Sequence, residues 1–364
     1  MGLFASRLGL ILALALSSHG AAAAQACRTV TLTDADAGAP IIGVEDMAYD
    51  PWSDEVYLSA FDRRAVADAL AAGTEPPAGA VYAINARRLV TEGPAFKLAA
   101  VFDQTPNGEA LRPHGIDVLV TNYGDRRLAI IHRGYDGRAR QVRLMVYDTT
   151  PDAPVLITDL ATSALCRAND VTIKDLRTVY VSLDHGGCAD WIARLEDVTG
   201  FRGGAVARVD YADPAPALSL AVRGLGFPNG LAWSPADDGL WIAATRENAL
   251  RFVPASALED GRVVRAQGSI RLDGAPDNLA RGDDDALTLA VHPDLLALAR
   301  HRADAGVPTA SRALGLTPAG QRPLVTIEPG AGFGGATVAI GVRGHIVLGA
   351  ATQAGIAICE TNTP

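Results

Sequence analysis

The sequence is poor in aromatic residues and has no basic cluster. Phenylalanine, tryptophan and tyrosine make up 5% of the 364 residues, although the hydrophobic fraction is 49%. Small residues must therefore fill much of the space in the core. The formal net charge is −9, with 32 basic and 41 acidic side chains. This balance argues against binding to nucleic acid and to anionic membrane surfaces.

Two common catalytic and binding motifs are also absent from the sequence. Ser163 and Ser182 do not stand in a Gly-x-Ser-x-Gly elbow. No glycine-rich pattern follows a strand and opens a helix, as a dinucleotide-binding turn would. The sequence therefore gives no support for an elbow-type serine hydrolase or a nucleotide-binding protein.

Residues 1–24 have the pattern of an export signal. Arg7 supplies a positive charge, Leu8 to Leu16 form an apolar run, and Ala22 to Ala24 form a small-residue cleavage site. The apolar run is too short to span a bilayer. We therefore expect an exported protein, periplasmic or secreted, with a single domain over 25–364 and no membrane attachment. An uncleaved anchor is the alternative.

Polar residues and glycine open six short apolar segments, each followed by a turn and a second apolar segment. The openings recur roughly every 50 to 70 residues. Repeats of this length that are built only of strands are typical of a propeller with four-stranded blades. The sequence thus predicts an all-β fold, a six-bladed β-propeller. The openings are Glu45–Tyr49, His114–Val118, Asn169–Ile173, Asn229–Trp233, Asp277–Ala280 and Ala336–Ile340.

Two further segments are predicted to be helical rather than extended. They are Ala189–Asp197 and Pro293–Ala303. Both follow the ends of predicted strands, where loops over the top face of a propeller begin. We therefore expect small helical lid segments over the mouth of the central tunnel.

Four cysteines in an exported protein can pair in three ways. A propeller closes its ring when an N-terminal strand completes the last blade, which favours a bridge between Cys27 and Cys359. Cys166 and Cys188 flank the strand pair of the third repeat, so they can form a second bridge. Two free buried thiols are the alternative, which an oxidising compartment disfavours.

Carboxylates and amides gather at the predicted openings. If the same blade position faces the axis in each repeat, these side chains converge, and the carboxylates repel one another unless cations neutralise them. Oxygen ligands with several amides favour Ca²⁺, and neighbouring residues on a strand point apart, which suggests two ions. The alternative is that each residue caps a turn. The residues are Glu45, Asp46, Asn169, Asp170, Asn229, Asp277 and Asn278.

Several short segments also carry a resemblance to a known family. They are Gly43–Asp46, Arg112–Ile116, Asn169–Asp170 with Asp184–His185 downstream, Phe227–Gly230, Asp277–Asn278 and Cys359–Glu360. In this order they resemble the paraoxonases, which are calcium-dependent lactonases and arylesterases with a six-bladed propeller. The resemblance runs over nearly all of the chain after the export signal. Gluconolactonase-like propellers share the blades and the metal but lack the His-Gly element.

The resemblance implies two calcium ions. A catalytic ion would be held by Glu45, Asn169, Asn229, Asp277 and Asn278. A structural ion would be held by Asp46, Asp170 and the backbone carbonyl of Ile116. Each set contains two carboxylates, which agrees with the charge argument.

The resemblance makes His114 the candidate general base, beside the catalytic calcium, where it would activate water. The family's supporting histidine on the next strand has no full match: His132 lies one residue early, and Arg133 occupies the matching place. One residue reverses side-chain direction in a strand. His185, in the Asp184-His185 pair, is the alternative partner.

The predicted function is therefore calcium-dependent hydrolysis of lactones and aryl esters. Calcium would stabilise the oxyanion, and His114 would take a proton from water. No lysine or arginine stands at the ligand openings, which favours a neutral substrate. Two alternatives stay open. One is a gluconolactonase-like sugar lactonase with an acidic base, and the other is a non-catalytic calcium-binding propeller that recognises a partner.

Overall fold

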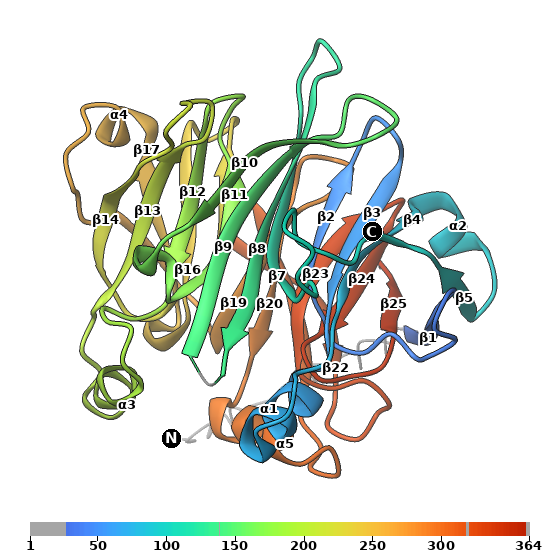
Figure 1. Cartoon of the computed structure of the whole chain (residues 1–364). Coiled ribbons are helices and arrows are strands. Elements are labelled where there is room, and N and C mark those ends of the chain that lie inside the picture. The colour runs from blue at the N-terminus through green and yellow to red at the C-terminus, as the bar shows by residue number, and fades with distance from the viewer. Residues whose placement is uncertain (1–26, 138, 318–319, 362–364) are drawn as a thin grey trace, which may run out of the picture.

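The computed structural model describes residues 27–137, 139–317 and 320–361. The predicted export signal, residues 1–24, lies outside the described residues. Six antiparallel sheets follow one another along the chain and surround a common axis (Figure 1). This confirms the predicted six-bladed β-propeller.

In each of the first five blades the first strand is innermost, and the strands are consecutive except in blade 1, where β5 Ala95–Leu98 leaves for blade 6. Blade 1 contains β2 Val44–Asp50, β3 Glu55–Ala60, β4 Ala80–Asn85 and β6 Ala100–Phe102. Blade 2 contains β7 Pro113–Val120, β8 Arg126–Asp136, β9 Ala139–Asp148 and β10 Val155–Ala161. Blade 3 contains β11 Ala168–Ile173, β12 Thr178–Leu183, β13 Gly204–Asp210 and β14 Leu218–Leu225.

The remaining blades follow the same plan until the ring closes. Blade 4 contains β15 Pro228–Ser234, β16 Gly239–Ala244, β17 Ala249–Pro254 and β18 Gly268–Arg271. Blade 5 contains β19 Ala275–Arg281, β20 Leu287–His292, β21 Ser311–Thr317 and β22 Gly320–Ile327. Blade 6 contains β23 Ala336–Val342, β24 His345–Ala350, β25 Ile356–Glu360, the N-terminal strand β1 Cys27–Asp34 and, parallel to β1, β5 Ala95–Leu98.

Both predicted disulfides are present. Cys27 of β1 lies opposite Cys359 of β25 in the antiparallel ladder, so their bridge fastens the strand that closes the ring. Cys166 and Cys188 form the second bridge between the segments that flank β11 and β12. All four cysteines are paired, which is typical of proteins from oxidising compartments.

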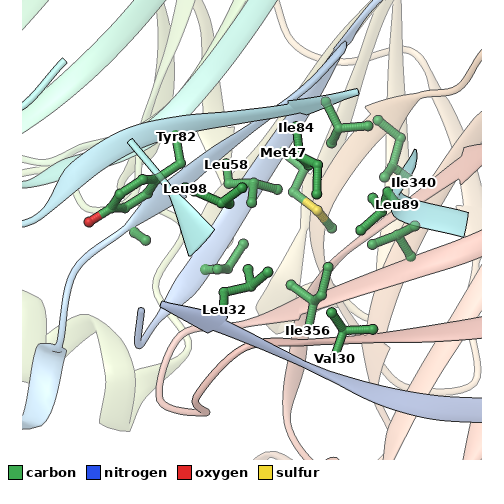
Figure 2. Packing of buried hydrophobic residues seen from close by; sticks show 14 of the residues in the cluster. Val30, Leu32, Met47, Leu58, Tyr82, Ile84, Leu89, Leu98, Ile340 and Ile356 are labelled. Atoms are coloured by element: carbon green, nitrogen blue, oxygen red, sulfur yellow. The ribbon is translucent and has the colours of Figure 1, made fainter. Parts of the chain in front are cut away.

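The core lies between the blades rather than in one centre. Figure 2 shows the cluster that joins the last blade to the first, where Val30, Leu32 and Ile356 pack towards Met47 and Leu58. Similar clusters of buried aliphatic side chains fill the other gaps. Because each sheet is covered on both faces, its inner strands are almost wholly buried, which explains their continuous apolar runs.

Both predicted helical segments are helices, as α3 Asp190–Thr199 and α5 Leu295–Ala303. A third helix, α1 Arg63–Ala72, was not predicted, and Figure 1 shows it beside α5 at one end of the propeller. Arg64 of α1 donates to the carbonyls of Thr352 and His301, which ties the two helices together. The described residues also form two short helices, α2 Ala86–Thr91 and α4 Ala255–Leu258, and 3-10 turns at Ser163–Leu165 and Thr245–Glu247. No helix in the described ranges is long and apolar enough to cross a membrane.

Every innermost strand begins with an irregularity. The register between the innermost strand and its neighbour shifts once in each blade, as a β-bulge does. Such a bulge adds one residue, bends the strand and redirects a side chain. The shifts fall at Val44/Asp46, Pro113/Ile116, Ala168/Val171, Pro228/Leu231, Pro276/Leu279 and Ala336/Val338. Each shift thus falls at one of the predicted openings.

Candidate functional site

A cavity of about 680 Å³ lies where the innermost strands begin, bordered by residues of α1, α3 and α5. The predicted lid helices α3 and α5 therefore stand at its mouth, together with the unpredicted α1. The cavity brings together six of the predicted site residues. They are Glu45, His114, Asn169, His185, Asn229 and Asp277.

Four buried oxygen atoms of the predicted catalytic metal set have no hydrogen-bond donor among the described residues. They come from four different blades: Oε2 of Glu45 and Oδ1 of Asn169, Asn229 and Asn278. An unpaired buried polar atom is costly and needs an explanation. Oxygen atoms of this kind are the ligands that Ca²⁺ prefers. The residues therefore fit a calcium ion at this position.

Neighbouring groups hold the ligand side chains in place. Asn278 donates through Nδ2 to the carbonyl of Glu45 at 2.9 Å, and Thr337 donates through Oγ1 to the same carbonyl at 2.8 Å. Asn229 donates through Nδ2 to Oδ1 of Asp277. With the nitrogen ends of both amides engaged in this way, their oxygen ends remain for a ligand. The sixth opening, represented by Thr337, thus supports Glu45 although it provides no predicted ligand.

Most side chains in the predicted catalytic metal set are amides rather than carboxylates. Accordingly, the described residues contain no group of three or more His, Cys, Asp or Glu that could hold a metal ion. A site of this kind would be held by two carboxylates and three amides. Such a set suits a hard cation, whereas zinc would require histidine or cysteine ligands.

Asp46 and Asp170 lie one residue deeper than Glu45 and Asn169 and are only 2% exposed. Each accepts hydrogen bonds from the next blade: Ile116 N–H donates to Asp46 at 2.8 Å, and Leu231 N–H donates to Asp170 at 2.6 Å. Among the described residues, neither has a basic partner within 4.0 Å. Burial, with repulsion from Asp170, raises the pKa of Asp46 well above its usual range. Two buried carboxylates that lack a basic partner fit a second cation.

The openings of successive blades approach one another closely. A Cβ atom at Gly115 would lie 2.5 Å from Cα of Asp170 in the next blade. Gly230 is similarly close to the backbone of Asn278. The glycines in the His-Gly and Asn-Gly elements therefore allow the blades to converge.

His114 lies beside the predicted metal ligands. Its Nδ1 forms a hydrogen bond with Arg63 at 2.5 Å and lies 2.8 Å from Oε2 of Glu45, and Arg63 is 3.3 Å from the same oxygen. Neither contact has hydrogen-bond geometry at this oxygen, so the attraction is electrostatic. Burial, together with Arg133, lowers the pKa of His114 to about 3. Burial opposes ionisation of Glu45, but His114 and Arg63 lower the pKa of Glu45 below its usual range. Because the His114 ring is neutral at pH 7, Arg63 provides the permanent positive charge beside Glu45.

The structure does not place His132 at the cavity. Its ring borders a separate hollow lined by residues of β8, β9 and the segment before β7, where Nδ1 accepts from the backbone of Arg112 at 3.1 Å. Arg133, the next residue of β8, faces the cavity instead. Adjacent strand residues point to opposite faces, and this separates His132 from His114.

His185 lies in the cavity wall but is surrounded by other charged groups. Its Nδ1 is 2.6 Å from Oδ1 of Asp184, and its Nε2 is 2.7 Å from Arg246 and 3.3 Å from Asp197. Its ring also packs edge-on against Phe227. His185 therefore belongs to a network in the wall, separate from the His114–Glu45 contact.

His292 has a place in the site that was not predicted. It ends β20, and its Nε2 lies 2.6 Å from Oδ2 of Asp277. Its Cα is paired with Ala275 of β19, two residues before Asp277. The signal in the sequence is its position at the end of the second strand of the blade, opposite a predicted ligand. His292 can orient Asp277, as outer partners of metal ligands do.

No family model matches the sequence, and no curated protein matches it at a significant level. Several solved structures match over most of the chain. A calcium-binding protein, regucalcin, from Agrobacterium tumefaciens has 12% identity, covers 91% of this chain and 95% of its own, and has a TM-score of 0.49. A gluconolactonase from Xanthomonas campestris has 12% identity, coverages of 88% and 87%, and a TM-score of 0.46. A luciferin-regenerating enzyme has 10% identity, coverages of 91% and 96%, and a TM-score of 0.48. At these values the likeness assigns no activity to the chain.

Proposed function

We propose that this protein is a calcium-dependent lactone hydrolase. The observation that carries the proposal is a set of buried oxygens without hydrogen-bond donors: those of Glu45, Asn169 and Asn229 border the cavity beside His114, and that of Asn278 belongs to a side chain bonded to the Glu45 carbonyl. Their residue types and order are those that resemble the paraoxonases. Asp277 would complete the ligand set, and Asp46, Asp170 and the carbonyl of Ile116 would hold a second calcium beneath it.

The bound ion would polarise the ester carbonyl and stabilise negative charge on its oxygen, as metal Lewis acids do. Asn278 and Thr337 hold the backbone of Glu45, and His292 holds Asp277, so the carboxylates are pre-oriented. Such fixed ligands favour the transition state because little reorganisation is needed when charge develops.

His114 is positioned to accept the proton of the attacking water. Its Nδ1 lies 2.8 Å from Glu45 and 2.5 Å from Arg63, and no described residue forms a hydrogen bond with its Nε2. The tautomer with its proton on Nδ1, facing Glu45, leaves Nε2 free to accept the proton of water. In the reaction, the water oxygen bonds to the acyl carbon and the acyl carbon–oxygen bond of the ring breaks. The proton taken up at His114 then passes to the alkoxide, and the product is one hydroxy acid. With His132 facing away, His114 acts without a histidine partner from β8.

The cavity favours polar lactones over lipophilic lactones and aryl esters. Its wall includes many arginine and aspartate side chains, and Phe227 is its only aromatic residue among those described. A wall of this kind hydrogen-bonds hydroxyl or carboxylate groups and does not bury a phenyl ring well. This observation favours a sugar-lactonase type of activity over an arylesterase.

A substrate panel tests the proposal. Purified protein would be assayed by proton release on an aldonolactone, an unsubstituted aliphatic lactone and phenyl acetate, each with calcium and with chelator. We expect calcium-dependent opening of the lactones, fastest for the polar one. Faster turnover of phenyl acetate would favour the arylesterase. Calcium-dependent stability without hydrolysis of any substrate would instead indicate the non-catalytic binding propeller.

A further inference from the structure

The cavity wall carries an excess of arginine that comes from outside the strand openings. Among the described residues, seven arginines border it, against six carboxylates, of which Glu45 and Asp277 belong to the predicted metal set. The arginines come from α1, β8, β9, the segment before β11, α3 and α5. They are Arg63, Arg64, Arg133, Arg140, Arg167, Arg194 and Arg302.

Arg133 is a cavity arginine with few partners. Its Nη2 donates to the carbonyl of Ala168 at 3.3 Å, and its buried Nε has no acceptor among the described residues. Within the same residues no carboxylate lies within 4.0 Å of its guanidinium. The carboxylates of Asp184 and Glu45 lie farther than this from Arg133. Asp184 is in contact with His185, and Glu45 with His114.

The neighbours of Arg133 increase the positive potential around it. Burial, together with Arg140 on the facing strand, lowers the pKa of Arg133 to about 9. The guanidinium still carries its charge at neutral pH. Arg63 and Arg302 lie 3.3 Å and 3.6 Å from Glu45 and Asp277. A cation bound by those two carboxylates would leave both arginines with less counter-charge.

We propose that Arg133 binds a carboxylate group of the substrate, so that the preferred substrate is an anionic lactone. This inference rests on the proposed lactone hydrolysis. A guanidinium is suited to such a group because its planar donors match the two oxygens of a carboxylate. Arg133 and His114 border the same cavity, which also contains the proposed reacting centre. A carboxylate held there would anchor the lactone ring beside the metal ligands.

The test compares two lactones of nearly equal size. One is γ-valerolactone, and the other carries a carboxylate in place of its methyl group. The wild-type preference is the ratio of the two kcat/KM values. We expect Arg133→Gln to lower this ratio roughly 10- to 100-fold, mainly through KM of the anionic lactone, since a hydrogen bond to a charged group has that effect. Arg133→Lys should recover part of the ratio.

A matched control separates anion binding from a structural role. Arg127 lies on the same strand but outside the cavity, where it pairs with Asp148 at 2.9 Å. Arg127→Gln should leave the ratio unchanged. If Arg133→Gln lowers turnover of both lactones by the same factor, Arg133 is structural and the inference is wrong. If Arg133→Gln does not fold, the ratio for Arg133→Lys decides, because an unchanged ratio there also contradicts the inference.

A binding measurement keeps the two proposals distinguishable. Titration calorimetry with α-hydroxyglutarate, the ring-opened form of the anionic lactone, tests Arg133 without catalysis. If the wild type opens neither lactone yet binds this anion more tightly than Arg133→Gln, lactone hydrolysis fails and the anion site stands. If both lactones are opened but anion binding and the ratio do not depend on Arg133, hydrolysis stands and the anion site fails.

Discussion

Replacing Asn169 by leucine should change stability in opposite directions with and without calcium. Asn169 is 5% exposed, its Oδ1 is buried without a donor, and its Nδ2 has no hydrogen bond to a described residue. A buried unpaired amide oxygen costs about 1 to 3 kcal/mol. Leucine has a similar volume and no polar atom. In chelator, Asn169→Leu should therefore leave the free energy of unfolding unchanged or raise it by up to about 3 kcal/mol.

Calcium reverses this expectation because Asn169 would be one of its ligands. At a free calcium concentration of about 100 times the dissociation constant, binding stabilises the wild type by about 2.7 kcal/mol. Asn169→Leu should lose most of that gain. The assay is urea unfolding followed by circular dichroism, in chelator and in calcium.

Asn85 provides the matched control for this experiment. Its Oδ1 accepts from the backbone of Arg88 at the start of α2, and its Nδ2 donates to the carbonyl of Asp54. Asn85→Leu should cost about 1 kcal/mol under both conditions, because it removes a helix cap. The reasoning is refuted if Asn169→Leu is as destabilising as Asn85→Leu in chelator and keeps the calcium gain.

Two further predictions concern ring closure and the proposed base. The two disulfides close loops of 332 and 22 residues. By loop entropy, Cys359→Ser should therefore lower the free energy of unfolding by about 6 kcal/mol, and Cys188→Ser should lower it by about 3 kcal/mol. Equal midpoints in urea would contradict this. His114→Gln should lower lactone turnover by about 10² to 10⁴ while keeping the stabilisation by calcium, whereas His132→Gln, outside the cavity, should lower it far less. Equal losses for both would rule out His114 as the sole base.

Much of the fold could be predicted because the repeat has a simple physical cause. Each innermost strand is buried on both faces, so its apolar run is continuous, and a polar opening precedes it. Ring closure then follows from the position of Cys27 and Cys359 at the two ends of the chain. The helix α1 was missed because its signals are local: Asp62 caps its first turn and Gly73 ends it with a φ of 71°. Neither residue follows the phase of the repeat.

The site could be predicted in its residue types but not in its orientations. Strand alternation places neighbours such as Glu45 and Asp46 on opposite faces, but the bulge at each opening changes the local direction of the strand. The contacts of His292 and Arg133 depend on how neighbouring strands pair. Most arginines at the cavity come from helices or from β8 and β9 beyond the openings, so the openings alone favoured a neutral substrate.

The most direct test of the account is the rate of lactone opening as a function of free calcium. The wild type would be stripped with chelator and then titrated with calcium, with Asp277→Asn measured alongside. The account predicts that hydrolysis falls to the buffer rate in chelator, returns with calcium, and does not return in Asp277→Asn. Undiminished lactone opening by the stripped wild type would contradict it.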